Sequence, residues 1–317
     1  MSKPLYTLTG KKIYVAGHRG MVGSAIVRRL QHEECDILTA GREEIDLTRQ
    51  NEVEQWMTEK KPDAILLAAA KAGGIQANNT LPADFLYDNL MIATNIIHAA
   101  YKAEVEKLLF LGSSCIYPRE APQPMNEDSL LTGPLEATNQ WYAIAKIAGI
   151  KMCQAYRRQY GCDFISAMPT NLYGPGDNYH PEHSHVPAAL IRRFHEAKEN
   201  GDTFVTVWGT GTPLREFMHV DDLANASIFL IQNYSEEGHI NIGSGQEISI
   251  ADFAKTVAKV TGFKGDLEFD TTRPDGTPRK LMDSTRLKAL GWQAGTDLES
   301  GLANAYKAYV ENLKNRN

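Results

Sequence analysis

The 317-residue chain has little cysteine, no long apolar run and no excess of basic residues. Its four cysteines are Cys35, Cys115, Cys153 and Cys162. None forms a CxxC pair, which argues against a disulfide framework and for reduced thiols. No run is long enough to cross a bilayer, and residues 1–12 lack the apolar core of a signal peptide. The formal net charge of −6 argues against a nucleic-acid binder. These absences predict a cytoplasmic protein without nucleic-acid or membrane partners.

Short apolar runs alternate with longer helical patterns over the first half of the chain. We expect strands at residues 12–16, 36–40, 64–70, 108–111 and 163–168. We expect the intervening helices at 21–32, 51–60, 83–103 and 141–160. This alternation predicts an α/β fold with a Rossmann-type, doubly wound parallel sheet.

The pattern becomes less regular in the second half, where Gly, Pro, Asn and His gather between residues 175 and 187. We interpret residues 1–174 as a Rossmann domain that binds a dinucleotide. Residues 175–317 then form a smaller C-terminal α/β domain that binds substrate. Helices are expected at 221–232 and 298–313, and whether one or both return to the first domain stays open.

The segment GHRGMVG, residues 17–23, lies between the first predicted strand and the first predicted helix. Glycines there let backbone N–H groups and a helix N-terminus approach a pyrophosphate. A glycine triplet also serves plain turns, but its place in the first βαβ unit predicts a dinucleotide site. The residues expected to line that site are Gly17, Arg19, Gly20, Met21, Val22 and Gly23.

Two arginines bear on the choice of nicotinamide cofactor. Arg42 follows the second predicted strand, where an acidic residue would favour the free ribose hydroxyl of NAD, and Arg19 lies within the glycine loop. Two guanidinium groups would suit the extra phosphate of NADP, so we expect NADP(H). Glu43 and Glu44 keep NAD as an alternative, and either arginine alone could be an ordinary surface charge.

Tyr142 and Lys146 lie four residues apart within a long predicted helix and therefore share a face. A nearby cation is expected to lower the pKa of the tyrosine toward neutrality, which suits a proton donor to a carbonyl. The spacing is common, however, and an exposed Tyr–Lys pair would be the default without further motifs.

The segment GSSCIYP, residues 112–118, follows the predicted strand at 108–111. If the chain stays extended there, Ser113 and Cys115 face one side and Ser114 turns away. Ser113 would then hydrogen-bond a substrate carbonyl, and the Cys115 thiol would lie beside a neighbouring C–H bond that the carbonyl acidifies. A base at that position can invert stereochemistry. The alternative for the thiol is a small, buried apolar side chain.

The segment HPEHSH, residues 180–185, lies in the loop that enters the second domain. A histidine titrates near working pH and can supply a proton from the other side of a sugar ring. Simple exposure is the ordinary role of each histidine here. A metal site is a weaker alternative because no cysteine or carboxylate set completes it, so no metal is expected.

Together these motifs resemble the extended short-chain dehydrogenase/reductase family, which modifies nucleotide sugars. The resemblance covers nearly the whole chain. Its later segments PTNLYGPGDN (169–178) and REFMHVDD (215–222) resemble sequence motifs of the family. The chain most closely resembles those members that epimerise and reduce a GDP-sugar. The segments that carry this resemblance are GHRGMVGSAI, LGSSCIYP, YAIAKIAGIK, PTNLYGP and PDGTPRKL. The resemblance implies an NADPH-dependent enzyme acting on a small-molecule nucleotide sugar, GDP-4-keto-6-deoxy-D-mannose. It would carry out 3,5-epimerisation and then 4-keto reduction, because reduction removes the activating ketone.

The resemblance also implies a role for each candidate residue. It places the epimerisation base at Cys115 and its acid at His185, and the reductive set at Ser113, Tyr142 and Lys146. Beyond the glycine loop it implies cofactor contacts at Arg42, Asp46, Leu47, Ala69, Ala70, Lys146, Pro169, Asn171, Leu172 and His185. It implies substrate contacts at Asn171, Val186, Arg193, Trp208, Arg215 and Lys280. A homodimer built through the Tyr142 helix and its neighbour is expected on the same grounds.

Two alternative functions stay open. A nucleotide-sugar 4-epimerase or 4,6-dehydratase would share the fold, but a 4-epimerase keeps NAD bound and needs no thiol. The dehydratases of the family usually carry acidic residues where this chain has Ser114, Cys115 and Ile116. A dinucleotide-sensing regulator without catalysis would keep the fold but commonly loses the Tyr–Lys pair. The residues alone do not distinguish guanine from other bases.

Overall fold

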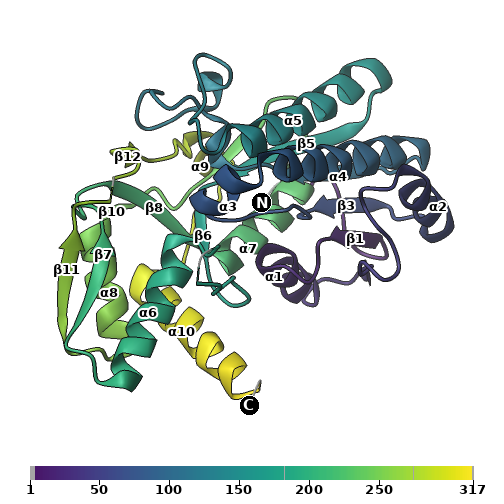
Figure 1. Ribbon diagram of the computed structural model, residues 1–317. Coiled ribbons are helices and arrows are strands. Elements are labelled where there is room, and N and C mark those ends of the chain that lie inside the picture. The colour runs from purple at the N-terminus through teal and green to yellow at the C-terminus, as the bar shows by residue number, and fades with distance from the viewer. Residues whose placement is uncertain (1–3, 182, 274, 316–317) are drawn as a thin grey trace.

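Six parallel strands form the central sheet of the computed structural model, which describes residues 4–181, 183–273 and 275–315 (Figure 1). In spatial order they are β2 (Asp36–Leu38), β1 (Lys12–Ala16), β3 (Ala64–Leu67), β4 (Lys107–Leu111), β5 (Asp163–Pro169) and β9 (Ile240–Ile242). Every neighbouring pair is parallel. This confirms the predicted doubly wound α/β fold.

The strand order reverses at β1. From β1 the chain first crosses to β2 on one side and then to β3 on the other. The crevice at the carboxyl end of such a strand is where doubly wound folds bind their ligands. The glycine loop follows β1 directly, so the fold brings it to this crevice.

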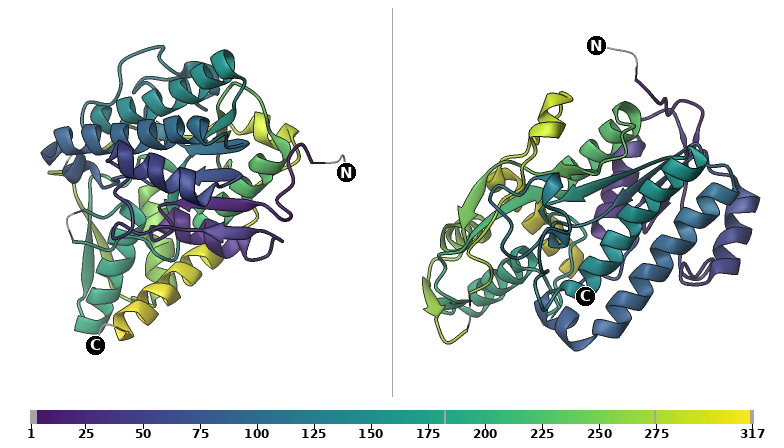
Figure 2. Two further views of the ribbon diagram at one scale, coloured as in Figure 1. Left: turned by 90° about the vertical axis from the view of Figure 1, so that its right-hand side faces the viewer. Right: turned by 90° about the horizontal axis from the view of Figure 1, so that it is seen from above.

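Alternate residues of the central strands fill two cores, because the side chains of a strand point to opposite faces. On β1, Tyr14 and Ala16 pack into one core, and Ile13 and Val15 into the other. The first core is covered by α2 (Gln50–Lys60), α4 (Pro82–Lys102) and α5 (Gln140–Tyr160). The second core is covered by α1 (Met21–Leu30) and α7 (Val220–Asn233). Figure 2 shows the long helices α4 and α5 side by side.

The second part of the molecule has shorter strands around a third core that includes Phe194, Phe217 and Phe253. In one sheet β8 (Leu214–His219) lies beside β6 (Asn171–Tyr173), β10 (Glu247–Ser249) and β12 (Arg279–Lys280). A separate pair consists of β7 (Phe204–Trp208) and β11 (Asp266–Asp270). The helices of this part are α6 (Val186–Asn200), α8 (Ile250–Thr261) and α10 (Leu298–Lys314).

Segments from the second half of the sequence complete the first sheet. Helix α7 packs against α1, and β9 pairs with β5 at the edge of the sheet, where the short helix α9 (Thr285–Ala289) contacts it. Helix α10 packs instead on α8 and β8 through Leu302 and Ala305. The two helices whose destination was open thus lie in different parts. The boundary near residue 174 stays a prediction.

Three short elements lie between β3 and α5: α3 (Ile75–Thr80), η1 (Ser114–Ile116) and η2 (Glu127–Ser129). Several helix ends have local causes. Asp297 caps α10 by accepting a hydrogen bond from the Ser300 amide, and Gly161 ends α5 with a φ of +72°. Within the described residues, no helix is sufficiently long and apolar to span a membrane.

Candidate active site

The glycine loop turns so tightly between β1 and α1 that larger residues would not fit. Gly17 has a φ of +87°, and a Cβ there would lie 2.7 Å from the Cα of Ala69. A Cβ at Gly23 would overlap the carbonyl oxygen of Gly17. Glycine at these positions therefore lets the loop, the start of α1 and the end of β3 approach one another closely. Ala69 and Ala70, both expected at the cofactor, directly follow β3 at this place.

The N-terminus of α1 is suited to an anion. The helix begins at Met21 after Gly20, and among the described residues no side chain caps it and its first turn holds no acidic residue. Its free N–H groups and the positive end of the helix dipole therefore point at the crevice. Together with the space that the glycines leave, this end of α1 fits a pyrophosphate.

Arg19 and Arg42, expected at the cofactor ribose, differ in their partners. Arg19 forms a bidentate ion pair with Glu43. Its Nη1 lies 2.8 Å from Oε2, and its Nη2 binds Oε1. Arg42 is exposed, and the described part of the chain offers it no ion pair. A phosphate here would have to compete with Glu43 for Arg19. Arg42 is therefore the stronger phosphate candidate of the two.

The other cofactor candidates lie in the loop between β2 and α2, at the end of β5 and on β6. Asp46 accepts hydrogen bonds from the backbone and side chain of Thr48, which lower its pKa. Leu47 is held by its carbonyl, which accepts from Asn95 at 3.0 Å. Pro169 ends β5, and Leu172 lies on β6.

The backbone after β4 turns instead of staying extended. Residues Ser114–Ile116 form the 3-10 turn η1, and the amide of Cys115 donates to Oγ of Ser113 at 3.5 Å. The expected strand-like alternation is therefore wrong, because the Ser113 hydroxyl caps a turn. Ser114 is buried, while Ser113 and Cys115 keep partial exposure. The turn thus leaves both candidate side chains accessible by a different geometry.

Lys146 of α5 is anchored by backbone in the middle of the site. Its Nζ donates to the carbonyl of Leu111 at 2.9 Å and lies 5.6 Å from the centre of the Tyr142 ring. Burial lowers the pKa of Lys146 to about 8. Burial also raises the pKa of Tyr142, and the nearby Cys115 adds to the rise. The expected lowering of the tyrosine pKa is wrong, because desolvation of the phenolate dominates here.

Two lysines bring positive charge to the Cys115 thiol. Burial raises the pKa of Cys115, whereas Lys280 above all, followed by the Ser113 hydroxyl and Lys146, acts to lower it. Lys280 itself has a pKa lowered by burial. The sequence predicted Lys280 only as a substrate contact, so its bearing on the thiol is a new feature of the structure.

His185 is the N-cap residue of α6 and is exposed, as is the following Val186. Desolvation by the surrounding protein lowers the pKa of His185, and the positive charge of Lys280 lowers it further. The loop that carries His180, His183 and His185, called the histidine loop below, packs on the turn before α3. There the Gly74 amide donates to the His183 carbonyl at 3.1 Å. Lys280 thus bears on both candidates for proton transfer, Cys115 and His185.

The metal alternative gains no support from the histidine loop. The rings of His180 and His183 stack at 4.5 Å. In the described ranges, which omit residue 182, no group of three His, Cys, Asp or Glu side chains is placed to hold a metal ion.

The candidates for diphosphate binding lie on α6 and β8. Burial lowers the pKa of both Arg193 and Arg215. Arg193 donates to the carbonyl of Thr206, and Arg215 donates to that of Leu214 at 2.8 Å. Lys280 on β12 is in register with Arg215 on β8, which brings two cations side by side.

Trp208, expected near the nucleotide, ends β7 with 60% of its surface exposed. The guanidinium of Arg273 lies over its ring, 5.0 Å from the centre. Such an exposed aromatic face next to a cation can stack on a nucleobase.

The geometry can be compared with known proteins at this point. A model of the NAD dependent epimerase/dehydratase family matches residues 13–243 of the chain. The chain belongs to this family. The matched region runs from β1 to just beyond β9, and therefore includes the glycine loop, the Ser113–Cys115 turn and the Tyr142–Lys146 pair.

Several curated relatives are similar over almost their whole length. The GDP-L-fucose synthase of Sinorhizobium fredii (strain NBRC 101917 / NGR234) is 58% identical over 98% of this chain and 99% of the relative. GDP-L-fucose synthase 1 of Arabidopsis thaliana is 61% identical over 96% of this chain and 95% of the relative. The GDP-L-fucose synthase of Escherichia coli (strain K12) is 54% identical over 96% of this chain and 98% of the relative.

Solved structures agree with these relatives. A GDP-L-fucose synthetase from Naegleria fowleri bound to NADP has a TM-score of 0.91 and 27% identity, covering 99% of this chain and 98% of its own. A UDP-glucose 4-epimerase from Thermotoga maritima, 21% identical with a TM-score of 0.84 over 95% of this chain and 99% of its own, shares the fold.

Glu216 is one polar residue near the site that the sequence did not single out. It is fully buried on β8, where its carboxylate accepts hydrogen bonds from the amides of Gly245 at 2.7 Å and Met282 at 3.0 Å. Its carbonyl accepts from Nδ2 of Asn171 at 2.9 Å. Glu216 therefore orients Asn171 and fixes the segment just after Lys280. The signal in the sequence is an acidic residue inside the strand LREFMH, directly before Phe217 and Met218.

Proposed function

We propose that the chain is an NADPH-dependent enzyme that converts GDP-4-keto-6-deoxy-D-mannose to GDP-L-fucose. It epimerises the sugar at C3 and C5 and then reduces the C4 ketone in the same site. The observation that carries the proposal is the grouping of an accessible thiol with the Ser–Tyr–Lys set: Cys115 is close enough to Tyr142 and Lys146 to affect their pKa values. The relatives named GDP-L-fucose synthase, 54% to 61% identical, support the choice of substrate.

The glycine loop and the start of α1 would hold the pyrophosphate of NADP(H), and Arg42 would bind its 2′-phosphate. When bound there, NADPH supplies the hydride for reduction at C4. The NADP-bound Naegleria structure supports this cofactor.

In epimerisation, Cys115 would act as the base and His185 as the acid. The thiolate takes a proton from the carbon next to the C4 ketone, and the electron pair moves onto the ketone oxygen, which Ser113 holds. His185 then returns a proton to the opposite face of that carbon, which inverts it. Lys280 assists because its charge opposes the burial that raises the pKa of the thiol. A shift of the sugar between two positions lets one pair serve both C3 and C5.

In reduction, Tyr142 would protonate the C4 oxygen. Ser113 would hold that oxygen, and Lys146 would lie beside the phenol. The raised pKa of Tyr142 keeps the phenol protonated before the step, as a proton donor requires. Lys146, held on the Leu111 carbonyl, places a cation under the phenol that can stabilise the phenolate formed by the transfer.

The diphosphate of the substrate would bind Arg193, Arg215 and Lys280, and the nucleotide would lie near Trp208. Charge-assisted contacts from cations in register, as Arg215 and Lys280 are, suit two neighbouring phosphates. Asn171 and Val186 would contact the sugar.

The proposal is tested by mixing the protein with NADPH and GDP-4-keto-6-deoxy-D-mannose. We expect the cofactor absorbance to fall in proportion to the GDP-L-fucose formed, identified by NMR of the sugar. Formation of the unepimerised alcohol would reduce the assignment to a plain reductase, and no oxidation of NADPH would overturn it.

A homodimer through α4 and α5 belongs to the same proposal. These helices and the adjoining segments expose large apolar side chains, among them Tyr87, Trp141, Ile144 and Tyr160. Sedimentation should give twice the 35.2 kDa chain mass, and Ile144→Glu should lower it to the mass of one chain. An unchanged mass in this variant would move the interface elsewhere.

We also propose a cytoplasmic location. The four cysteines are free thiols in the structure, which suits a reducing compartment. Cell fractionation with an antibody to the chain would test this, and recovery in a membrane or secreted fraction would contradict it.

A further inference from the structure

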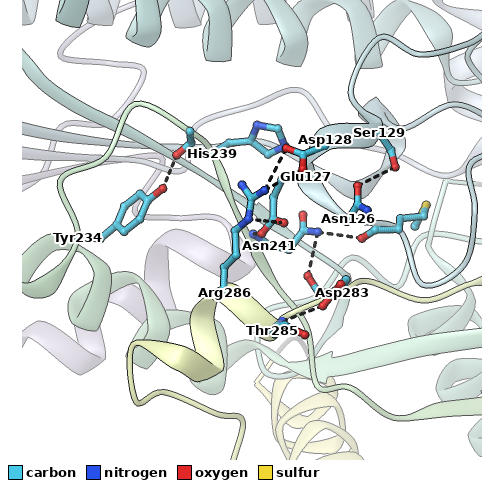
Figure 3. Close-up of polar contacts among 12 residues, drawn as sticks. Asn126, Glu127, Asp128, Ser129, Tyr234, His239, Asn241, Asp283, Thr285 and Arg286 are labelled. Carbon is cyan, nitrogen blue, oxygen red and sulfur yellow. Dashed lines mark hydrogen bonds and ion pairs between the residues drawn. The ribbon is translucent and has the colours of Figure 1, made fainter.

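A buried polar network lies between η2, β9 and the start of α9 (Figure 3). At its centre is Asn241 of β9, which has no exposed surface. Its Nδ2 donates to the carbonyls of Met125 at 3.0 Å and Asp283 at 3.1 Å, and its backbone amide donates to Glu127 at 3.0 Å. Asn241 therefore joins β9 to two segments that are far from it in the sequence, residues 125–127 and the segment of Asp283.

The orientation of the Asn241 amide is fixed by its partners. The two carbonyls can only accept, so the nitrogen must face them and Oδ1 must face the other way. Oδ1 lies 2.5 Å from the hydroxyl of Tyr117, which therefore donates to it. The Tyr117 oxygen is then left to accept from Nε2 of His239, 3.0 Å away. The result is one directed chain of hydrogen bonds, from His239 through Tyr117 to Asn241.

A second set of contacts locks this arrangement. The Glu127 carboxylate lies 3.3 Å from Nε of Arg286, and Arg286 also binds Asp128 at 3.0 Å. Figure 3 shows Arg286 reaching from the α9 side to both acidic side chains of η2. An ion pair of this kind is costly to break when one partner is as buried as Glu127.

The network is attached to both ends of the proposed epimerisation site. Tyr117 directly follows η1, the turn that carries Cys115. Met125 is bonded to the segment after Lys280, because its amide donates to the Leu281 carbonyl at 2.8 Å and its carbonyl accepts from the Asp283 amide at 2.8 Å. Asn241 thus connects the turn of the thiol to the strand of the lysine.

We propose that Tyr117 and Asn241 are positioning residues that hold the Cys115 thiol at its working distance from the Lys280 ammonium. This inference rests on the proposed function, in which the thiol removes a proton. The groups that influence the pKa of the thiol, or are influenced by it, are Lys280 from β12, Tyr142 and Lys146 from α5, and the Ser113 hydroxyl. The network is attached to the segments that carry Cys115 and Lys280. It does not hold Lys146, which is anchored separately on Leu111. Loss of the network should therefore impair epimerisation and spare reduction.

The test is Tyr117→Phe, which removes one hydroxyl and leaves the ring in place. Its matched control is Tyr234→Phe. The Tyr234 hydroxyl also makes a partly buried hydrogen bond, but it donates to the Gly238 carbonyl at 2.6 Å, a backbone acceptor that is not a member of the chain from His239 through Tyr117 to Asn241. Epimerisation is followed as deuterium uptake at C3 and C5 with NADP⁺ present, over a range of pH. Reduction is followed as single-turnover oxidation of NADPH by the already epimerised ketone.

In Tyr117→Phe we expect deuterium uptake to fall about tenfold, the loss that one broken hydrogen bond to a positioning group typically causes, and its pH profile to move to higher pH. Reduction should change by less than about twofold. Tyr234→Phe should match the wild type in both. Should Tyr117→Phe fail to fold, His239→Leu removes the donor to the Tyr117 oxygen instead, with a smaller loss of uptake expected.

Equal losses of uptake and reduction, or no loss in either, would overturn the inference. Equal losses in Tyr117→Phe and Tyr234→Phe would also overturn it, since they indicate general destabilisation. Absence of deuterium uptake in the wild type would be a different result, because it would remove the proposed function itself.

Discussion

The two walls of the proposed active site are built in different ways. The cofactor wall is mainly backbone: glycines between β1 and α1, and the open N-terminus of α1. The sugar wall is made of side chains on turns and short strands, in which burial shifts the pKa values of Cys115, Lys146 and Lys280. The first wall selects a ligand by space and by N–H groups. The second depends on charges that are strong because little water screens them.

This difference predicts which changes affect which step. A change in the backbone wall should alter cofactor binding and leave proton chemistry intact. A change at Cys115 or Lys280 in the side-chain wall should alter proton chemistry and leave cofactor binding intact.

Cys115→Ser should have the largest effect. A serine hydroxyl is a far weaker base than a thiolate, so deuterium uptake at C3 and C5 should fall by about 10³-fold. The affinity for NADPH, measured by fluorescence titration, should be unchanged. Cys35→Ser, at another partly exposed thiol, is the control and should keep full uptake. Undiminished uptake in Cys115→Ser would remove the thiol from the mechanism.

Lys280→Met should change the pH dependence of the same step. Without this cation the burial of Cys115 is less opposed, so the thiol pKa rises and less thiolate is present at a given pH. We expect the uptake profile to move up by about one pH unit, measured with saturating substrate. Lys288→Met, at an exposed lysine on α9, should leave the profile in place. An unshifted profile in Lys280→Met would show that the lysine serves the diphosphate alone.

Gly23→Ala tests the backbone wall. The new Cβ would overlap the Gly17 carbonyl and push α1 away from the loop. The dissociation constant for NADPH should rise by about tenfold. Gly295→Ala is the control, because a Cβ there meets nothing within 4 Å. Equal affinity in both variants would mean that the loop does not contact the cofactor.

Arg42→Ala should have the smallest effect and sharpen the account of cofactor choice. We expect the affinity for NADP to fall about fivefold with little change for NAD, because only NADP carries the phosphate. Arg158→Ala, at an exposed arginine near the end of α5 that pairs with Glu237, should leave both affinities unchanged. Parallel losses for NADP and NAD in Arg42→Ala would contradict this role.

The backbone wall could be predicted from the sequence because its signals are local. Strand β1, the glycines after it and the start of α1 all lie close to their predicted places. The side-chain wall could not be predicted to the same depth. An extended chain and a 3-10 turn both suit Ser113 to Cys115, and the turn follows from a Ser113 side-chain bond and the burial of Ser114.

The pKa values of the site residues could not be predicted from the sequence either. Spacing places Lys146 on the same helix face as Tyr142, but only the packed structure shows that desolvation outweighs that charge. The role of Glu216 could not be predicted from the sequence for a similar reason. Its partners, the amides of Gly245 and Met282, come from segments that only the fold brings to β8.

The central claim is that proton abstraction and hydride transfer use separate groups in one site. Tyr142→Phe tests it most directly, with deuterium uptake and NADPH oxidation measured on the same sample. We expect NADPH oxidation to fall by about 10²-fold or more, while uptake at C3 and C5 continues at close to the wild-type rate because Cys115, His185 and Ser113 are intact. Loss of uptake to the same extent as oxidation would contradict the claim.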